Sequence, residues 1–146
     1  MKIERFKEKH REGYSLLLKD AFDVVLKAET VKMLSDSQDY FALVAVDEAD
    51  AVCGGMIAEY RKDCMTNVTS YFLTYVTVKQ DMRHKGIGRE LFREIERMAE
   101  ERNVAHIEFT CADFRKESHK FYEAIGYSRK KTKVFIKERK DYGKGN

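Results

Sequence analysis

Residues 76–89 combine residue types at a spacing that could bind phosphate. A run of β-branched residues ends at Val78, a basic cluster follows, and Gly86 and Gly88 precede a strongly amphipathic stretch. This order predicts a strand, a turn and the N-terminus of a helix, where backbone N–H groups and the helix dipole together bind anions. We therefore expect a ligand that carries phosphate groups.

Two common phosphate motifs do not fit these glycines. The pattern GxxxxGK[ST] cannot be drawn through Gly86 or Gly88. A dinucleotide fingerprint would need a third glycine at position 91, where Leu91 stands. The alternative interpretation is that the two glycines only make a strand-to-helix turn, with the basic residues 83–85 facing solvent.

A second group of interest lies about 30 residues later, at residues 118–127. Here the pair Phe121-Tyr122 is followed four residues on by the pair Gly-Tyr at 126–127, which is typical of a helix end that packs against a following strand. We expect Phe121 to pack in the core. The phenol of Tyr122 suits either core packing or proton transfer.

The spacing of histidines and cysteines in the sequence matches no common metal-site or disulfide pattern. His84 and His119 have no partner at metal-ligand or catalytic-triad spacing. The cysteines Cys53, Cys64 and Cys111 are odd in number and form no CxxC pair. The sequence predicts neither a metal site nor a disulfide framework.

The elements that must position these groups follow from the hydrophobic periodicity. Runs of β-branched and aromatic residues predict strands, and apolar residues three and four apart predict helices. We predict strands at 1–6, 40–46, 51–60, 70–79, 104–112 and 131–138, and helices at 12–27, 30–34, 86–102 and 116–125. The order β-αα-βββ-α-β-α-β indicates an α/β fold with a mixed sheet.

Composition fits one globular domain. The 146 residues are 43% hydrophobic and 36% charged, and the net charge of +3 comes from interspersed acidic and basic residues, which gives no argument for a nucleic-acid partner. No apolar run approaches the roughly 20 residues of a membrane helix. Residues 1–6 have no signal-peptide hydrophobic region, so we expect a cytoplasmic protein without a membrane partner.

Together the two groups resemble the motifs of the GCN5-related N-acetyltransferase (GNAT) family. Two motifs carry this resemblance: R-x-x-G-I-G after a strand that ends Val-x-Val, and F-Y-x-x-x-G-Y about 30 residues later. The resemblance implies a mixed, mostly antiparallel central sheet, flanked by helices and splayed at a cofactor cleft. It also implies a single domain 1–146, in which residues 1–39 form variable substrate-side helices, 40–138 the acetyl-CoA-binding core and 139–146 a tail.

The resemblance further implies the ligand and the residues that bind it. Acetyl-CoA would place its pyrophosphate on backbone N–H groups at the helix N-terminus. Its pantetheine arm would pair with the backbone of Val76 and Val78, as an added strand pairs with a sheet edge. The implied cofactor-binding residues are Val76, Val78, Arg83, His84, Lys85, Gly86, Ile87, Gly88 and Arg89. No metal is implied.

Tyr122 matches the family's usual general acid, which protonates the CoA thiolate after a neutral amine has attacked the thioester. The general base has no evident position, because residues 70–80 contain no carboxylate where many members have one. Glu108, on the next predicted strand, is the nearest matching carboxylate, and a chain of water molecules is the alternative. Arg115 stands where the second motif frequently has asparagine, which puts that cofactor contact in doubt.

The acceptor is the least specified part of the reaction. Acidic residues within 10–39 would suit a cationic amine, although amphipathic helices carry such charges in any case. We expect an N-acetyltransferase acting on a primary amine of a small molecule. The alternatives are a protein N-terminal or lysine acetyltransferase and a non-catalytic acyl-CoA-binding module. The expected partners are acetyl-CoA and the amine acceptor. Dimers are frequent in the family, so the resemblance is compatible with a homodimer, but no residue here requires one.

Overall fold

The computed structural model describes residues 1–140, and they divide into two compact units. The first unit comprises residues 1–110, and the second begins at Cys111. Each unit is described separately below. The expectation of one domain, with its three internal parts, stays a prediction.

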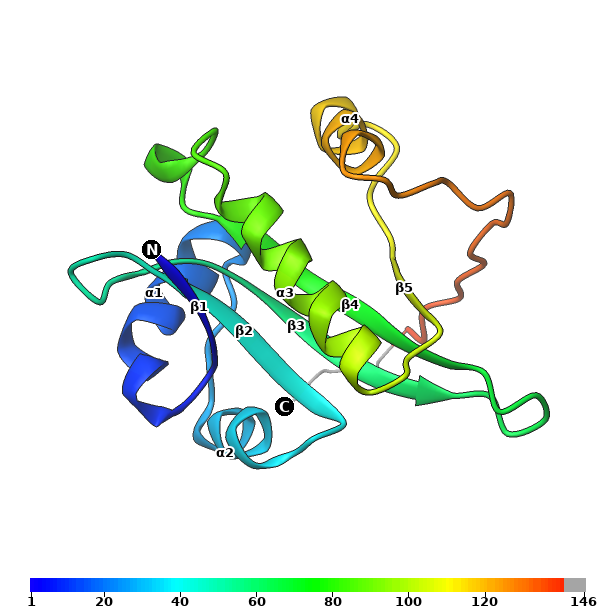
Figure 1. Cartoon of the computed structure of the whole chain (residues 1–146), viewed down its shortest axis with the longest axis horizontal. Helices are drawn as coiled ribbons and strands as arrows, with labels where there is room; N and C mark the ends of the chain where they lie inside the picture. The colour runs from blue at the N-terminus through cyan, green and yellow to red at the C-terminus, as the bar shows by residue number, and fades with distance from the viewer. Residues whose placement is uncertain (141–146) are drawn as a thin grey trace. The chain divides into compact units, whose positions relative to one another are not determined.

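A five-stranded sheet forms the centre of the first unit (Figure 1). Its strands are β1 (Lys2–Arg5), β2 (Tyr40–Val46), β3 (Val52–Lys62), β4 (Thr69–Val78) and β5 (His106–Phe109), and they lie side by side in that order. Strands β1 to β4 are antiparallel to their neighbours, whereas β5 is parallel to β4. The mixed, mostly antiparallel sheet expected from the sequence is therefore confirmed.

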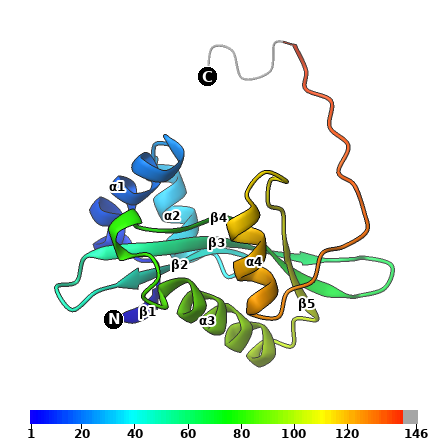
Figure 2. The ribbon, with the colours of Figure 1, turned by 90° about the horizontal axis from the view of Figure 1, so that it is seen from above.

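Helices cover both faces of this sheet (Figure 2). The first face carries α1 (Arg11–Phe22) and α2 (Ala28–Asp36), which follow the short 3₁₀ helix η1 (Glu8–His10). The opposite face carries α3 (Ile87–Glu101), which connects β4 to the parallel strand β5. A second 3₁₀ helix, η2 (Gln80–Met82), lies between β4 and α3.

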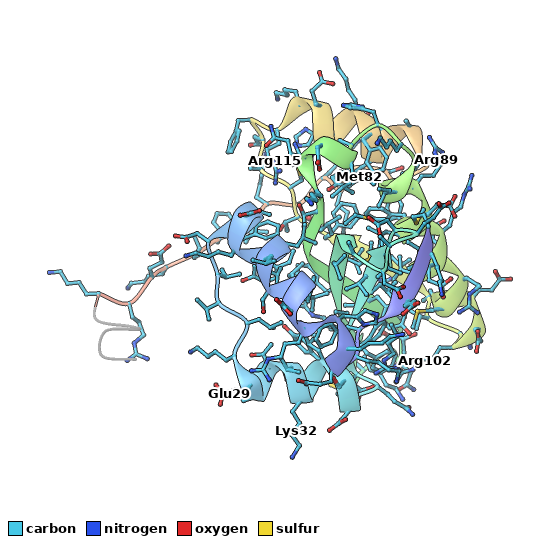
Figure 3. The ribbon with its side chains drawn as sticks, turned by 90° about the vertical axis from the view of Figure 1, so that its left-hand side faces the viewer. Glu29, Lys32, Met82, Arg89, Arg102 and Arg115 are labelled. Carbon is cyan, nitrogen blue, oxygen red and sulfur yellow. The ribbon has the colours of Figure 1, made fainter. Side chains whose placement is uncertain are left out.

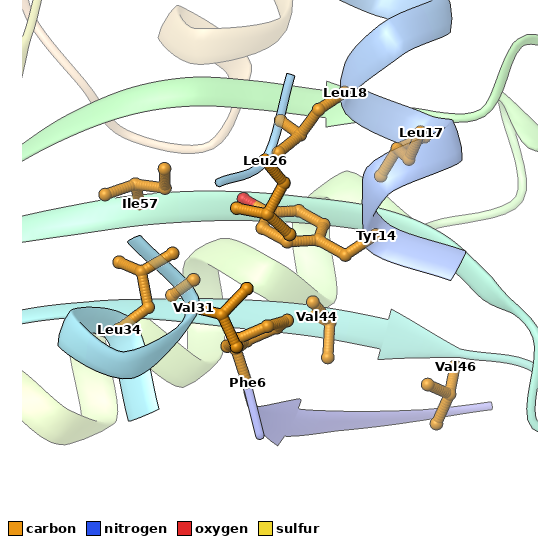
Figure 4. Close-up of a cluster of buried hydrophobic side chains, with 11 residues drawn as sticks. Phe6, Tyr14, Leu17, Leu18, Leu26, Val31, Leu34, Val44, Val46 and Ile57 are labelled. Atoms are coloured by element: carbon orange, nitrogen blue, oxygen red, sulfur yellow. The ribbon is translucent and has the colours of Figure 1, made fainter. Parts of the chain in front are cut away.

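Because both faces are covered, β2 is apolar along almost its whole length. Its residues from Phe41 to Val46 are all buried, so the strand does not show the alternation of a half-exposed sheet. Alternate side chains of β2 join a cluster with residues of α1, α2 and the segment after β1, drawn in Figure 4. This cluster contains Phe6, Tyr14, Leu17, Leu18, Leu26, Val31, Leu34, Ala42, Val44, Val46 and Ile57.

Helix α3 has the amphipathic pattern predicted for it. Ile87, Leu91 and Ile95 recur every four residues and are buried against the sheet. Its outer face carries ion pairs from Arg97 to Glu94 and Glu101. Burial of the apolar face stabilises the helix on the sheet far more than these exposed pairs do.

The second unit contains α4 (Lys116–Ala124). The C-cap residue Ile125 is followed by Gly126, which at φ +102° has the left-handed conformation that glycine tolerates best. Arg129 forms an ion pair with Glu123 at 2.8 Å, which ties the chain beyond the helix back to its last turn.

The strand predicted at 131–138 is wrong. These residues form no strand or helix, and Val134, Phe135 and Ile136 are 79%, 93% and 80% exposed. Their β-branched and aromatic character suits a strand, but a strand also needs a neighbour for its backbone hydrogen bonds. Residues 141–146 of the predicted tail lie outside the described residues.

Candidate active site

The loop between β4 and α3 has a backbone conformation suited to anion binding. His84 and Gly86 both have positive φ, at +64° and +85°, and Gly86 is the N-cap of α3. Because glycine has no side chain to cap the helix, the first N–H groups of α3 keep their capacity to donate to a ligand. Residues in this alternating conformation turn successive N–H groups toward one concave surface, which attracts anions.

Basic side chains surround this loop. Arg83, His84, Lys85 and Arg89 are all exposed. Arg83 donates from Nε to the carbonyl oxygen of Val78 at 3.2 Å, which holds the loop against the end of β4. Figure 3 labels Met82, the last residue of η2 within this loop, and Arg89, in the first turn of α3. The loop thus combines the positive end of a helix dipole with four cationic or protonatable groups.

The edge of β4 beside this loop has no strand partner within residues 1–110. The pairing of β5 with β4 begins at Ser70 and stops at Leu73, opposite Phe109. Strand β4 continues for five more residues, to Val78. The segment 74–78, which includes Val76 and Val78, therefore presents backbone groups that an extended ligand can pair with.

A β-bulge deforms β4 within this same segment. The register of β3 against β4 shifts between Gly55 and Ile57. Tyr75 and Val76 therefore lie opposite a single residue of β3, Met56. Tyr75 has φ +53°, a left-handed conformation that is costly for an aromatic residue. No sequence signal predicted this bulge, because glycine and asparagine, the usual residues at such positions, are absent from β4.

Tyr122 lies in α4 of the second unit and is half-buried. Burial raises the pKa of its phenol above the ordinary value, the neighbouring Cys111 thiol acts in the same direction, and Arg115 opposes both. A raised pKa keeps the phenol protonated at neutral pH, which is the form a general acid requires. Its catalytic role stays a prediction.

Glu108 lies on β5 opposite Phe72 of β4. Val78 is six residues further along β4, which corresponds to about 20 Å at roughly 3.3 Å per residue. The structure therefore does not bring Glu108 to the end of β4 at which Val78 and the basic loop meet. Its role as general base stays a prediction without geometric support from the strand register.

The described part of the chain contains neither a candidate metal-binding cluster nor a helix that could span a membrane. Residues 1–140 contain no group of three or more His, Cys, Asp or Glu side chains placed to hold a metal ion. Within the same residues, every helix is too short or too polar to cross a bilayer.

Comparison with solved structures identifies the fold. A putative acetyltransferase from Agrobacterium tumefaciens matches with a TM-score of 0.83 and 16% identity, over 94% of this chain and 100% of that one. The aminoglycoside acetyltransferase AAC(6')-Iy, bound to the bisubstrate analog CoA-S-monomethyl-acetylneamine, matches with a TM-score of 0.81 and 16% identity, over 94% and 97%. An aminoglycoside acetyltransferase from an uncultured soil metagenomic sample gives a TM-score of 0.81 and 16% identity, over 94% and 95%. At these identities, the likeness shows the fold alone.

Sequence comparison identifies the family. No curated protein matches the chain. The model of the acetyltransferase (GNAT) family, however, matches residues 4–127, which include the β4–α3 loop and α4. Because this match covers most of the 146 residues and agrees with the fold, the chain belongs to the GNAT acetyltransferase family.

Proposed function

We propose that the protein transfers the acetyl group of acetyl-CoA to a primary amine of a small molecule. The observation that carries the proposal is the junction of β4 and α3. There the edge of β4 at 74–78, which has no strand partner within residues 1–110, ends at a loop rich in N–H donors and cations. The structural neighbours support the donor and the acceptor class, because two are aminoglycoside acetyltransferases and one is bound to a CoA-linked analog of an aminoglycoside.

The proposed cofactor site uses this junction in two ways. The pyrophosphate binds to the N–H groups of residues 84–89, where each charge–dipole contact contributes up to about 1–2 kcal/mol. The side chains of Arg83, His84, Lys85 and Arg89 add favourable charge around it. The pantetheine arm pairs with the backbone of Val76 and Val78, as an additional strand would.

The proposed chemistry is direct transfer. The lone pair of the neutral amine forms a C–N bond to the thioester carbonyl carbon, and a tetrahedral oxyanion results. A backbone N–H near Val78 stabilises this oxyanion. The C–S bond then breaks, and Tyr122 donates its proton to the departing thiolate. Because the register of β5 keeps Glu108 opposite Phe72, we propose that water rather than Glu108 removes the amine proton.

Thiol release from acetyl-CoA tests the reaction. We would measure it against a panel of diamines, amino sugars, aminophosphonates and peptides. In the Tyr122→Phe variant, the ring keeps its packing and loses its proton, so kcat should fall at least about tenfold, within the range of general acid catalysis, while affinity for acetyl-CoA is kept. Near-normal turnover would exclude Tyr122 as the acid.

The same panel separates the alternatives. Release with peptides but not with small amines would favour a protein acetyltransferase. Stabilisation of the fold by acetyl-CoA without release from any acceptor would instead favour a non-catalytic acyl-CoA-binding module.

A further inference from the structure

The β4 bulge fixes an aromatic side chain in a position that the proposed reaction has not yet used. Tyr75 is 41% exposed and lies in the segment of β4 that pairs with β3 on one side and, within residues 1–110, has no strand partner on the other. Its positive φ takes its side chain out of the regular alternation of the strand. Strained conformations of this kind persist where the surrounding structure holds them, and they concentrate at functional sites.

Phe22 holds the ring of Tyr75 from the side of α1. The two ring centroids are 5.0 Å apart and the rings are nearly perpendicular, at 86°. This edge-to-face arrangement is a favoured geometry for aromatic pairs. Phe22 is also the last residue of α1, so the pair fixes the Tyr75 ring at the C-terminal end of that helix.

The end of α1 beside the Tyr75 ring favours a positive charge. Its π face attracts cations electrostatically. The C-terminal end of α1 carries the negative end of the helix dipole, since its last carbonyl groups have no partners within the helix. The adjacent carboxylate of Asp23 forms an ion pair with Lys19, so the carbonyl groups supply the local negative potential.

A buried hydroxyl adds a third favourable feature. Tyr14 of α1 is fully buried, and among residues 1–140 its hydroxyl has no hydrogen-bond partner. Its ring packs on Gly55, beside the bulge, where an added Cβ would lie 2.8 Å from Tyr14 Cε1. Figure 4 shows the hydroxyl directed away from α1, across the sheet. The lone pairs of the Tyr14 oxygen accept no hydrogen bond from residues 1–140, so this oxygen keeps its partial negative charge on the face of the sheet that α1 covers (Figure 2).

We propose that the face of Tyr75, positioned by Phe22, binds a second ammonium group of the acceptor. The reacting amine must be neutral to attack the thioester, so it cannot itself supply a lasting positive charge. The site therefore selects small molecules with two or more amino groups over monoamines of the same length. This inference rests on the proposed function, which it deepens by naming the acceptor class.

Steady-state kinetics with a matched pair of acceptors test the proposal. The probes are 1,5-diaminopentane and 1-aminopentane, which differ only in the second amino group. The wild-type protein should use the diamine with a kcat/KM at least about tenfold higher, mainly through KM, as expected for a contact made equally before and during reaction.

Two variants at position 75 isolate the ring. Tyr75→Gly removes the ring and suits the positive φ, so the fold should be preserved. It should reduce the preference for the diamine by about threefold to thirtyfold, the range of a cation–π contact. Tyr75→Phe keeps a ring face and should keep most of the preference. An undiminished preference in Tyr75→Gly, or a wild-type preference for the monoamine, would overturn the proposal.

Direct binding separates this proposal from the proposed reaction. Calorimetric titration of 1,5-diaminopentane into the protein saturated with CoA requires no turnover. If thiol release is absent but the diamine binds, and binding weakens in Tyr75→Gly and not in Tyr75→Phe, the site stands and the reaction fails. If thiol is released from monoamines and diamines alike, with equal KM in both variants, the reaction stands and the site fails.

Discussion

The N-cap of α3 offers a sharp test, because the cost of changing it can be calculated from backbone conformation alone. Gly86 has φ +85° and ψ +5°, and a Cβ added there would meet no atom within 4 Å. Gly86→Ala therefore adds no clash. Alanine in the left-handed region costs about 1–2 kcal/mol. The lower conformational entropy of the unfolded chain returns about 0.4–1 kcal/mol, so the net cost is about 1 kcal/mol.

This strain can appear in either of two measurements. If the loop keeps its conformation, the free energy of unfolding in urea falls by about 1 kcal/mol, and the melting temperature falls by about 2–4 °C. If the loop relaxes instead, the N–H groups lose their alignment, and the Kd for acetyl-CoA rises about fivefold, the equivalent of about 1 kcal/mol. Gly86→Asn should show about half of either effect, because asparagine tolerates this conformation better.

Gly126 provides the matched control. It also has a positive φ, at +102°, and no atom within 4 Å of an added Cβ. Gly126→Ala should therefore lose a similar amount of stability, while the rise in Kd for acetyl-CoA should be smaller than in a relaxed Gly86→Ala loop. A Gly86→Ala protein with unchanged stability and a Kd within twofold of wild type would refute the assignment of this loop as a strained anion site.

Other measurements test the core. Burial raises the pKa of the Tyr14 phenol above about 10, its value in the unfolded chain, so the folded protein loses stability as the pH rises above about 10. The loss is about 1.4 kcal/mol per pH unit. Tyr14→Phe should abolish this part of the loss, which urea titrations at about pH 9 to 11 would measure. Equal pH profiles for both proteins would contradict this. Phe92→Ala should cost about 3–5 kcal/mol in free energy of unfolding, because Phe92 is only 1% exposed. Phe135→Ala, at a side chain 93% exposed, should stay within about 0.5 kcal/mol, and a larger loss would show that Phe135 packs in solution.

Elements with strong local periodicity could be predicted from the sequence. Helix α3 is one example, because its apolar residues Ile87, Leu91 and Ile95 recur at helical spacing and follow a glycine N-cap. Strand β2 is another, because its continuous apolar run matches burial on both faces. The end of α1 was harder to predict from the sequence. The apolar spacing continues to Val25, but Asp23 takes a left-handed conformation that ends the helix at Phe22.

Features that depend on pairing between distant segments could not be predicted in the same way. The apolar segment at 134–136 has strand propensity, yet propensity does not supply a neighbouring strand. The bulge at Tyr75 arises from the register of β3 against β4, which no residue in β4 signals locally. The position of Glu108 depends on the register of β5 in the same way. The basic loop was predictable because its glycines and cations are contiguous.

The order of strands in the sheet also has a consequence for folding. Strands β2, β3 and β4 are neighbours both in space and in sequence, so they can pair through short loops at low entropic cost. The parallel strand β5 can join only after α3 has crossed the sheet. We expect the three-stranded meander to form first and the β4–α3 loop to be ordered last. Acetyl-CoA would then bind the native state but not the early meander, and it should slow unfolding without accelerating folding.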